Sequence, residues 1–329
     1  MADSILVVAE QREGKLNRVS FEAIAAAQAI SKDAGWPVEV VLAGNGIAAL
    51  AQELAQKAVA KVYALEAPAL VAYTSDAYVY ALKQFISGKQ PKLVLFPHTY
   101  QVRDFAPRLA LALDRTLISD SIGYKHENGK LLFTRQMFQG KFAADVSFAG
   151  EAPWLATIQI GAFRADQAEA GSAPVENVSA AFAESAARVT PHEVFQEAKQ
   201  AVDLSQAEVI VAVGRGIKEQ KNLTLAEDLA KALGGEVAAS RPICDNGWLP
   251  LERQIGSSGQ TVAPKLYFAL GISGAIQHIV GMKGSRSIIA INKDAEAPIF
   301  EIADYAIVGN LFDIVPPLIE EVKKAKAGS

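Results

Sequence analysis

The stretch that decides the fold is QIGSSGQTVAPKLYFALGISGAIQHIVGMKGSRSIIAINKD, residues 254–294. It predicts a Gly/Ser-rich loop, a short apolar strand at 266–270, a turn at 271–274, the start of a helix and a second strand at 287–291. A strand that ends at a glycine and enters a helix presents unbonded backbone N–H groups near the positive end of the helix dipole. We therefore predict an anion site at this turn, of the kind that suits a nucleotide pyrophosphate.

The composition excludes several classes of protein. The chain has 329 residues, half of them apolar, which is enough for about two domains. A net charge of −4 gives no basic footprint for nucleic acid or an anionic membrane. The single cysteine, Cys244, excludes an intrachain disulfide and a multi-cysteine metal site. With an apolar strand starting at Ser4 and no apolar run long enough to span a bilayer, we expect a cytoplasmic protein of bacterial type, without signal or transit peptide or membrane insertion.

The first half alternates strands and helices. Apolar runs at 4–9, 38–43, 61–66 and 92–97 are each followed by a helical pattern, and these patterns start near residues 20, 47, 75 and 102. Strands that alternate with helices of 10–15 residues predict βαβ units and a parallel sheet.

The pattern changes between residues 122 and 161. Asn128-Gly129 is a strong hairpin signal between two strand-like runs, and WLATIQI (154–160) closes the section. We predict antiparallel strands added to the edge of the first sheet. Residues 164–203 are rich in Ala, Glu and Ser, and we interpret them as a connection with some helix or edge strand. This places one domain at 1–188 and the other at 189–329.

The second half restarts the alternation. It predicts strands at 208–214, 236–240, 266–270, 287–291 and 306–309, with helices at 223–233 and 314–324. The predicted fold class is α/β, with two domains that are each a mostly parallel sheet flanked by helices, the second of them doubly wound. Ligand residues are expected at the carboxyl ends of its strands.

One dinucleotide-type glycine pattern lies in the first half. Gly44, Gly46 and Ala49 follow a strand and open a helix, and Glu66 follows at the appropriate distance. Turns from strand to helix need glycine in any case, so we favour a structural explanation. The second half lacks the full fingerprint, because Glu219 stands at the third glycine position after Gly214 and Gly216. A NAD-dependent oxidoreductase and a nucleotide-sensing protein stay open as alternatives.

Four segments of the second half resemble the alpha subunit of electron-transfer flavoproteins. They are GRGIK (214–218), ASRPICDNGWLP (239–250), RQIGSSGQTVAP (253–264) and LYFALGISGAIQHIVGMKGSRSIIAINKDAEAPIFEIADY (266–305), in the order and spacing of that family. The first half is similar more loosely, through segments such as HTYQVRDFAPRLA (98–110). Several ordered segments are far more specific than one glycine motif.

The resemblance implies an electron carrier and not a substrate-converting enzyme. It implies one FAD in the C-terminal domain and a heterodimer with a beta subunit, which holds AMP. Electrons would come singly from flavin dehydrogenases, such as the acyl-CoA dehydrogenases of fatty acid beta-oxidation, and go to the membrane-bound electron-transfer flavoprotein–quinone oxidoreductase. Variants that serve nitrogen fixation, carnitine metabolism or electron bifurcation stay open. No catalytic side chain, metal or nucleic-acid partner is expected.

The resemblance also assigns roles to residues of this chain. Arg215 would contact the cofactor diphosphate, Ser240 the cofactor, and Arg241 the flavin ring, while the Ser258 hydroxyl would bond flavin N5 and His278 would lie near the pyrimidine carbonyl. The remaining members are Gln254, Ile255, Gly256 and Ser257 around the ring; Ser273, Gly274, Ala275, Ile276 and Gln277 along the diphosphate and ribityl chain; and Asn292, Asn310 and Leu311 at the adenosine half. Many family members have Asp at position 310, so Asn310 keeps an acceptor oxygen but lacks the charge.

Arg241 fits the redox role because one-electron reduction places negative charge on a flavin. A pair of unit charges about 4 Å apart is worth about 4 kcal/mol at an effective dielectric near 20. That energy corresponds to at most roughly 170 mV for one electron. Each residue also has an ordinary alternative: Arg215 and Arg241 as surface or ion-paired arginines, and His278 as a helix cap.

Overall fold

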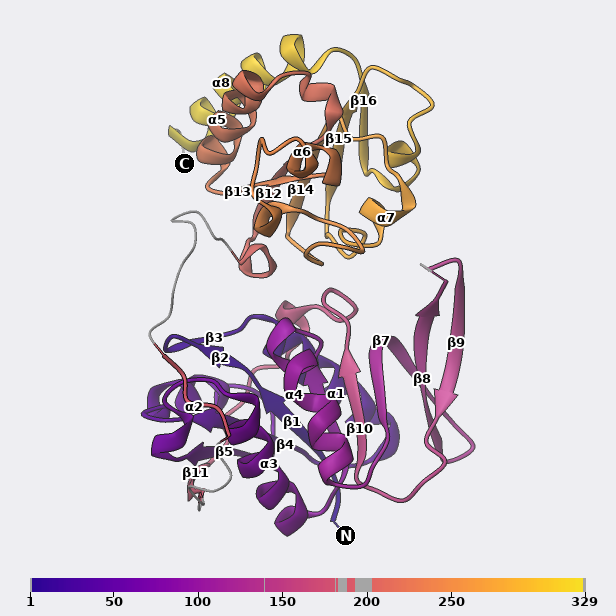
Figure 1. The fold of residues 1–329 in the computed structure, drawn as a ribbon. Helices are drawn as coiled ribbons and strands as arrows, with labels where there is room; N and C mark the ends of the chain where they lie inside the picture. Colours follow the sequence, from indigo (N-terminus) through magenta and orange to yellow (C-terminus); the bar gives the residue numbers. More distant parts are fainter. Residues whose placement is uncertain (1, 139, 181, 183–187, 193–202, 328–329) are drawn as a thin grey trace. The chain divides into compact units, whose positions relative to one another are not determined.

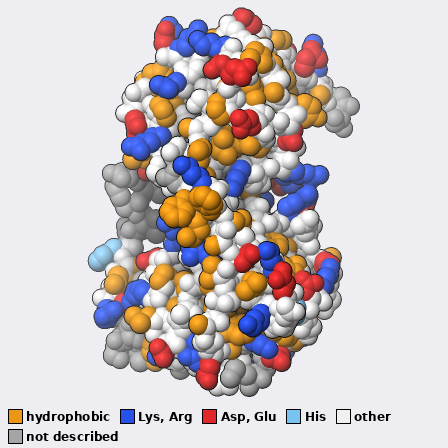
Figure 2. Space-filling model, turned by 90° about the vertical axis from the view of Figure 1, so that its right-hand side faces the viewer, with side chains coloured by type: hydrophobic (Ala, Val, Ile, Leu, Met, Phe, Trp, Pro, Cys, Tyr) orange, Lys and Arg blue, Asp and Glu red, His pale blue; other side chains and the backbone are white. Residues whose placement is uncertain are grey.

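A computed structural model describes residues 2–138, 140–180, 182, 188–192 and 203–327 (Figure 1). Contacts divide the chain into two compact units, residues 1–194 and 195–329. The boundary that the sequence predicts, between residues 188 and 189, lies slightly earlier in the chain. On the face of the molecule drawn in Figure 2, basic and acidic side chains are interspersed, in keeping with the small net charge of −4.

The first unit is built on a nine-stranded sheet in the order β11-β5-β4-β1-β6-β10-β7-β8-β9. The strands from β11 to β7 run parallel, which confirms the predicted parallel sheet. The first four βα units are β1 (Ala2–Ala9) with α1 (Val19–Ala34), β4 (Val38–Gly44) with α2 (Ala48–Leu54), β5 (Lys61–Glu66) with α3 (Ser75–Lys89), and β6 (Pro91–Pro97) with α4 (Tyr100–Ala112). A two-stranded ribbon, β2 (Gln11–Arg12) with β3 (Lys15–Leu16), follows β1.

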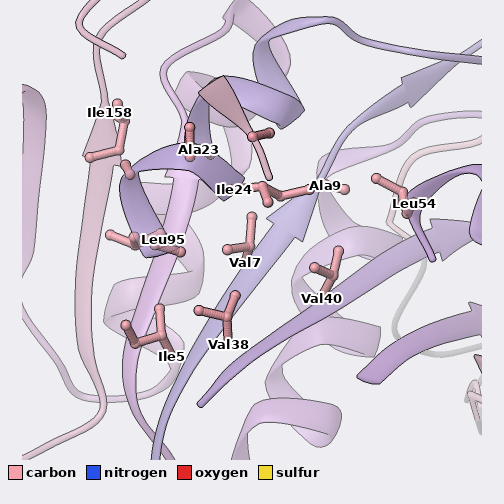
Figure 3. Close-up of a cluster of buried hydrophobic side chains, with 14 of the residues drawn as sticks. Ile5, Val7, Ala9, Ala23, Ile24, Val38, Val40, Leu54, Leu95 and Ile158 are labelled. Carbon is pink, nitrogen blue, oxygen red and sulfur yellow. The ribbon is translucent and has the colours of Figure 1, made fainter. Parts of the chain in front are cut away.

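Two hydrophobic cores lie on the two faces of this sheet. Along β1, Ile5 and Val7 belong to the core shared with α1 and α2, and Leu6 and Val8 to the core shared with α3 and α4. Figure 3 shows the first of these cores, where Ile24 of α1 lies among the strand side chains. The continuous apolar runs of the sequence follow from this burial on both faces.

The predicted hairpin is confirmed. β7 (Leu117–Glu127) and β8 (Lys130–Met137) are antiparallel and joined at Asn128 and Gly129, which both have positive φ angles, 51° and 74°. Positive φ at both central residues is typical of the tight hairpin turns that match strand twist. β9 (Phe142–Ser147) continues the antiparallel edge.

The prediction for residues 154–160 is wrong in its placement. β10 (Trp154–Ile158) is not part of the antiparallel edge but lies between β6 and β7, parallel to both. Its buried, apolar character suits an internal strand and not an edge. Within the predicted connection, β11 (Val175–Ser179) is the expected edge strand and pairs with β5. Other parts of that connection lie outside the described residues.

The second unit is a five-stranded, fully parallel sheet in the order β13-β12-β14-β15-β16. The five predicted strands are confirmed as β12 (Val209–Val213), β13 (Glu236–Ala239), β14 (Leu266–Leu270), β15 (Ile288–Asn292) and β16 (Tyr305–Val308). Numbered in chain order, the strands lie side by side as 2-1-3-4-5. The chain leaves β12 toward one side of the sheet to form β13, and it leaves β14 toward the other side to form β15 and β16. The strand order therefore reverses between β12 and β14. Such a switch point is where open α/β sheets bind ligands.

Helices cover one face of this sheet, and shorter segments cover the other. α5 (Leu223–Leu233) and α8 (Leu311–Ala327) pack on one core with α6 (Arg241–Asp245). α7 (Ile276–Ile279) and the 3-10 helix η8 (Pro298–Ile302) lie against the other. α8 begins three residues before the predicted start at residue 314, where Asn310 provides a cap for it.

Candidate functional site

The carboxyl ends of the five parallel strands of the second unit all lie at one edge of the sheet, and several of the predicted residues follow these strands. Arg215 follows β12, Ser240 follows β13, and Ser273 follows β14. Asn292 ends β15, and Asn310 follows β16. Residues separated by up to about a hundred positions in sequence therefore share one edge, as parallel pairing requires.

Glycines close the switch point between β12 and β14. A Cβ atom on Gly214 would lie 2.4 Å from the carbonyl oxygen of Gly271, and one on Gly216 would lie 2.6 Å from the Gly271 Cα. The two loops are held by a hydrogen bond from the Gly216 N–H to the Gly271 carbonyl, 3.0 Å long. Any larger residue here would push the two backbones apart.

The turn at 271–274 is present, and the predicted start of a helix behind it is the short helix α7, which contains Gln277 and His278. Gly271 and Gly274 have positive φ angles of 61° and 87°, and a Cβ on Gly274 would meet the backbone nitrogen of Ile299 at 2.1 Å. α7 has only four residues, so it carries little dipole. The dipole of so short a helix can add little to the anion site, which stays a prediction that depends mainly on the backbone N–H groups of the turn.

The loop 254–260 crosses the end of β13 and reaches α7. The Ile255 N–H donates to the Ala239 carbonyl at 2.9 Å, and the Ser257 N–H donates to the Gln277 carbonyl at 2.7 Å. Gly256, with φ 138°, allows this approach, since a Cβ there would lie 2.6 Å from the Gln277 oxygen. The loop that is predicted to surround the flavin ring is thus fixed beside the segment predicted to line the ribityl chain.

His278 is buried, and only one of its two ring nitrogens has a hydrogen-bond partner among the described residues. Its Nε2 lies 2.9 Å from the hydroxyl oxygen of Tyr267, whereas Nδ1 is buried with no hydrogen-bond partner among the described residues. Burial lowers the pKa of His278 to about 4; the backbone of Ile255 opposes this shift without satisfying hydrogen-bond geometry to Nδ1. The ring is therefore neutral at pH 7, and it is no simple helix cap.

The two predicted arginines are exposed. The Arg241 side chain is 69% exposed, and its Nε lies 3.3 Å from Asp245, one turn further along α6. Arg215 is exposed on the loop after β12, and its guanidinium has no hydrogen-bond or ion-pair partner in the described part of the chain. Both charges are available to a ligand at this edge.

The Ser258 hydroxyl accepts one hydrogen bond within the chain, and its own hydrogen can still be donated to a ligand. Gln254, which is buried, donates from Nε2 to the Ser258 Oγ at 3.0 Å. A hydroxyl that already accepts can still donate its own hydrogen. Ser258 is exposed, so that hydrogen can reach a ligand acceptor.

The residues predicted to contact the adenosine half of the cofactor also make hydrogen bonds or packing contacts within the protein. The Asn292 amide donates to the Ile272 carbonyl and accepts from the Asp294 N–H, at 2.9 and 3.0 Å. Asn310 donates to Asp313 and accepts from the Phe312 N–H, and so caps α8. The side chain of Leu311 packs in the core. Their adenosine contacts stay a prediction.

The other predicted residues divide between surface and interior. Ser257, Ser273, Ala275, Ile276 and Gln277 are exposed along this edge, Ser240 is half-buried, and Ile255, Gly256 and Gly274 are buried. Sequence reasoning missed Tyr267. A tyrosine in the apolar run LYFAL signals a buried hydroxyl that needs a partner.

The glycine pattern of the first unit has a structural explanation. Glu66 accepts a hydrogen bond from the Ile47 N–H at 2.9 Å, so its carboxylate is occupied by the turn itself. Gly46 has a φ of 68°, and a Cβ on Gly44 would meet Ile47 at 2.5 Å. The turn needs these glycines without any ligand.

Other kinds of site find no support in the described residues. No three His, Cys, Asp or Glu side chains gather there in a way that could hold a metal ion. Within the same residues, no helix has both the length and the apolar character to cross a membrane. Cys244 is free and buried, and burial raises the pKa of its thiol to about 11, as expected for a packing residue.

The second unit is therefore an open, doubly wound α/β domain with a polar edge at its switch point, the class in which nucleotide cofactors are commonly bound. The family described as Electron transfer flavoprotein domain matches residues 5–183, and the one described as Electron transfer flavoprotein FAD-binding domain matches residues 203–283. The chain belongs to the alpha-subunit family of electron transfer flavoproteins.

Relatives match over nearly the whole chain. Electron transfer flavoprotein subunit alpha of Bacillus subtilis is 41% identical over 327 residues, which cover 98% of both chains. The protein of the same description from Thermoanaerobacterium thermosaccharolyticum is 40% identical over 324 residues, again 98% of both. Acryloyl-CoA reductase electron transfer subunit beta of Anaerotignum propionicum is 37% identical and covers 98% of this chain and 96% of its own.

Proposed function

We propose that the second unit holds one FAD along the carboxyl ends of its strands, and that the chain transfers single electrons as the alpha subunit of a heterodimer. The observation that carries the proposal is the convergence of the predicted cofactor residues on one edge, at the switch point of the sheet. Membership of the electron transfer flavoprotein family supports it. FAD, when bound, supplies the one-electron chemistry; the residues of the chain bind and orient it.

The residues present fit such a cofactor. His278 keeps a buried Nδ1 without a partner in the described residues, which is costly unless a ligand satisfies it. The close backbone contacts of Gly216 and Gly271 hold the loops after β12 and β14 together with no side chain between them. This contact would keep the loops that carry Arg215 and Ser273 in place for a ligand that lies across them.

Different polar side chains would bind different parts of the cofactor. Arg215, unpartnered among the described residues, would bind the diphosphate as a donor of paired hydrogen bonds. The Ser258 hydroxyl would donate to a ring nitrogen of the flavin, and Arg241 would place a cation beside the ring. Solvent weakens that cation, because the side chain is 69% exposed.

The partners follow from the family and belong to the same proposal. We expect a beta subunit that holds AMP, flavin dehydrogenases such as acyl-CoA dehydrogenases as electron donors, and the membrane-bound quinone oxidoreductase as acceptor. In this assignment the chain works in the cytoplasm as a carrier in fatty acid beta-oxidation.

A second candidate function is delivery of electrons within one enzyme complex. It is favoured by the similarity to the electron transfer subunit of an acryloyl-CoA reductase, which is 37% identical over 98% of this chain. The two candidates differ in whether the heterodimer accepts electrons from several dehydrogenase partners or copurifies with a single enzyme. Pull-down from the native source under low salt distinguishes them.

The test is to co-express the chain with its neighbouring beta-type gene and record the visible spectrum through a stepwise reduction. Flavin absorbance in the purified heterodimer and two separate one-electron steps are the expected result. A colourless heterodimer, or one that binds NAD and no FAD, would contradict the proposal. The second outcome would favour the NAD-dependent oxidoreductase, and a colourless protein that binds free nucleotide would favour the sensor.

A further inference from the structure

Tyr267 and His278 form an isolated polar pair inside the second unit. Tyr267 lies on β14 and is 0% exposed; His278 lies on α7 and is 6% exposed. The hydroxyl oxygen and Nε2 are 2.9 Å apart, and the ring planes are inclined by 60°. The pair is surrounded by the apolar side chains of one core, including Ile255 and Ile272.

The protons of the pair can be assigned by counting donors and acceptors. In the described residues the Tyr267 hydroxyl has one hydrogen-bond partner, the Nε2 of His278. If Nε2 carried the proton, it would donate to the tyrosine oxygen and leave the tyrosine O–H buried without an acceptor. If Tyr267 donates instead, Nε2 accepts, and the single proton of the neutral ring sits on Nδ1. In the chain alone each arrangement leaves one buried donor unsatisfied, at about 1–3 kcal/mol, but the first also leaves Nδ1 as an unpaired acceptor. Only in the second is the unsatisfied donor the atom that a ligand acceptor can pair with.

In the second arrangement the ring presents Nδ1–H as its remaining donor. This atom is buried and unpartnered among the described residues, so a ligand acceptor would complete the network. The position of the ring is fixed from the other side by β14, and α7 alone, with its single turn, would hold it less firmly.

We propose that Tyr267 is a positioning residue of the cofactor site: its buried hydroxyl donates to Nε2 of His278 and holds the imidazole neutral, with Nδ1–H directed at a carbonyl oxygen of the ligand. The proposal rests on the proposed function, in which the flavin pyrimidine carbonyl lies beside His278. Negative charge grows on that carbonyl when the flavin is reduced, so a fixed N–H donor favours the reduced cofactor.

The first test reads the tautomer directly in the heterodimer. Histidine labelled with 15N gives ring spectra from His98, His126, His192 and His278 of this chain beside those of the beta subunit, and loss of one set in His278→Gln assigns the His278 ring. We expect protonated Nδ1 and bare Nε2 at His278, and a mixture of tautomers in Tyr267→Phe. Protonated Nε2 in the unsubstituted chain would overturn the proposal. This measurement on the unsubstituted chain does not depend on the stability of any variant.

The second test is a double-mutant cycle on the flavin potential. Tyr267→Phe is expected to weaken the preference for reduced over oxidised flavin about threefold to tenfold, where tenfold is about 59 mV for one electron. In the His278→Ala background the same substitution should change it by less than about twofold, because the hydroxyl acts through the ring. Equal effects in both backgrounds, or none in either, would contradict the positioning role while leaving FAD binding intact.

A matched control distinguishes the proposed effect of Tyr267 on His278 from the general effect of removing a buried tyrosine hydroxyl. Tyr78→Phe also removes a buried hydroxyl, which donates to the Ala43 carbonyl at 3.2 Å, but in the first unit. It should leave the flavin potential and the His278 tautomer unchanged. If the unsubstituted heterodimer binds no FAD, the proposed function fails and this assignment fails with it.

Discussion

At the scale of the residue, the charged group of Arg241 lies at the surface, whereas that of Glu22 is buried. Arg241 keeps its charge at the surface, where solvent weakens it, and pairs with Asp245. Glu22 has its carboxylate inside the first unit, 1% exposed, where it accepts from the Gly161 N–H at 2.7 Å. In the proposed function Arg241 would act on the bound cofactor, whereas Glu22 makes the stability of the fold depend on pH.

Replacement of Arg241 by Gln should lower the flavin midpoint potential by about 30–100 mV, less than a fully buried cation would give. The measurement is a reductive titration of the heterodimer. Lys265→Gln is the matched control, since this exposed, ion-paired cation precedes β14 at the opposite edge of the sheet. A potential that moves equally in both variants would mean that net charge, and not the position of Arg241, sets it.

Glu22→Gln should remove a pH dependence of folding. Burial raises the Glu22 pKa from 4.5 to about 7, against the weaker opposing effects of the Gly161 N–H and Arg18. Between these values the unfolded chain loses the proton while the folded chain keeps it, so stability falls as pH rises, by about 3 kcal/mol in total. Above pH 7 the loss is complete.

The glutamine variant should therefore stay within about 1 kcal/mol of the unsubstituted chain near pH 5 and exceed its stability near pH 8 by about 3 kcal/mol, because the shift in pKa already includes the effect of Arg18. Urea unfolding at the two pH values measures this. Glu127→Gln, beside the hairpin turn, is the exposed control. Loss of stability at both pH values would show that the ionised carboxylate is needed by the fold.

At the scale of the element, the switch point depends on two loops whose backbones touch. Gly216→Ala places a methyl group 2.6 Å from the Gly271 Cα, and backbone cannot move aside as a side chain can. We expect a loss of about 3 kcal/mol from the second unit and loss of FAD from the purified heterodimer. Thermal unfolding and the ratio of flavin to protein absorbance measure the two effects.

The control is a glycine with open space. Gly88 lies in α3 with nothing within 4 Å of an added Cβ, so Gly88→Ala should stabilise by about 0.5–1 kcal/mol through helix propensity. If Gly216→Ala retained FAD and stability, the close packing of the two loops would have no part in the site.

At the scale of the whole molecule, two separate pairs of cores predict two unfolding events. The first unit has its cores on the two faces of the nine-stranded sheet, and the second unit has its own pair. Scanning calorimetry should resolve two transitions. FAD should raise the one that Gly216→Ala lowers, because a ligand stabilises only the unit that binds it, and Glu22→Gln should move the other. One transition that responds to all three changes would contradict independent units.

The sequence alone determined the number and order of most elements. Apolar runs covered on both faces, helix periodicity and Asn128-Gly129 are local patterns, and they led to the parallel sheets and the hairpin that the structure contains. It failed at β10, since a short, mostly apolar run such as WLATI does not indicate which strands it pairs with. At α7 the sequence indicated where a helix starts but not its length, which the structure limits to four residues.

Part of the candidate site could also be predicted from the sequence. Parallel strands and the glycine turn predicted which residues meet at one edge, and the family resemblance gave them roles. The tertiary structure alone decided that Glu66 is occupied by its own turn, that Asn310 caps α8 and that Tyr267 reaches His278. Periodicity and turn chemistry act between neighbours in sequence and can be read from it. A hydrogen bond between side chains on different elements depends on how those elements pack, which is fixed only when the chain has folded.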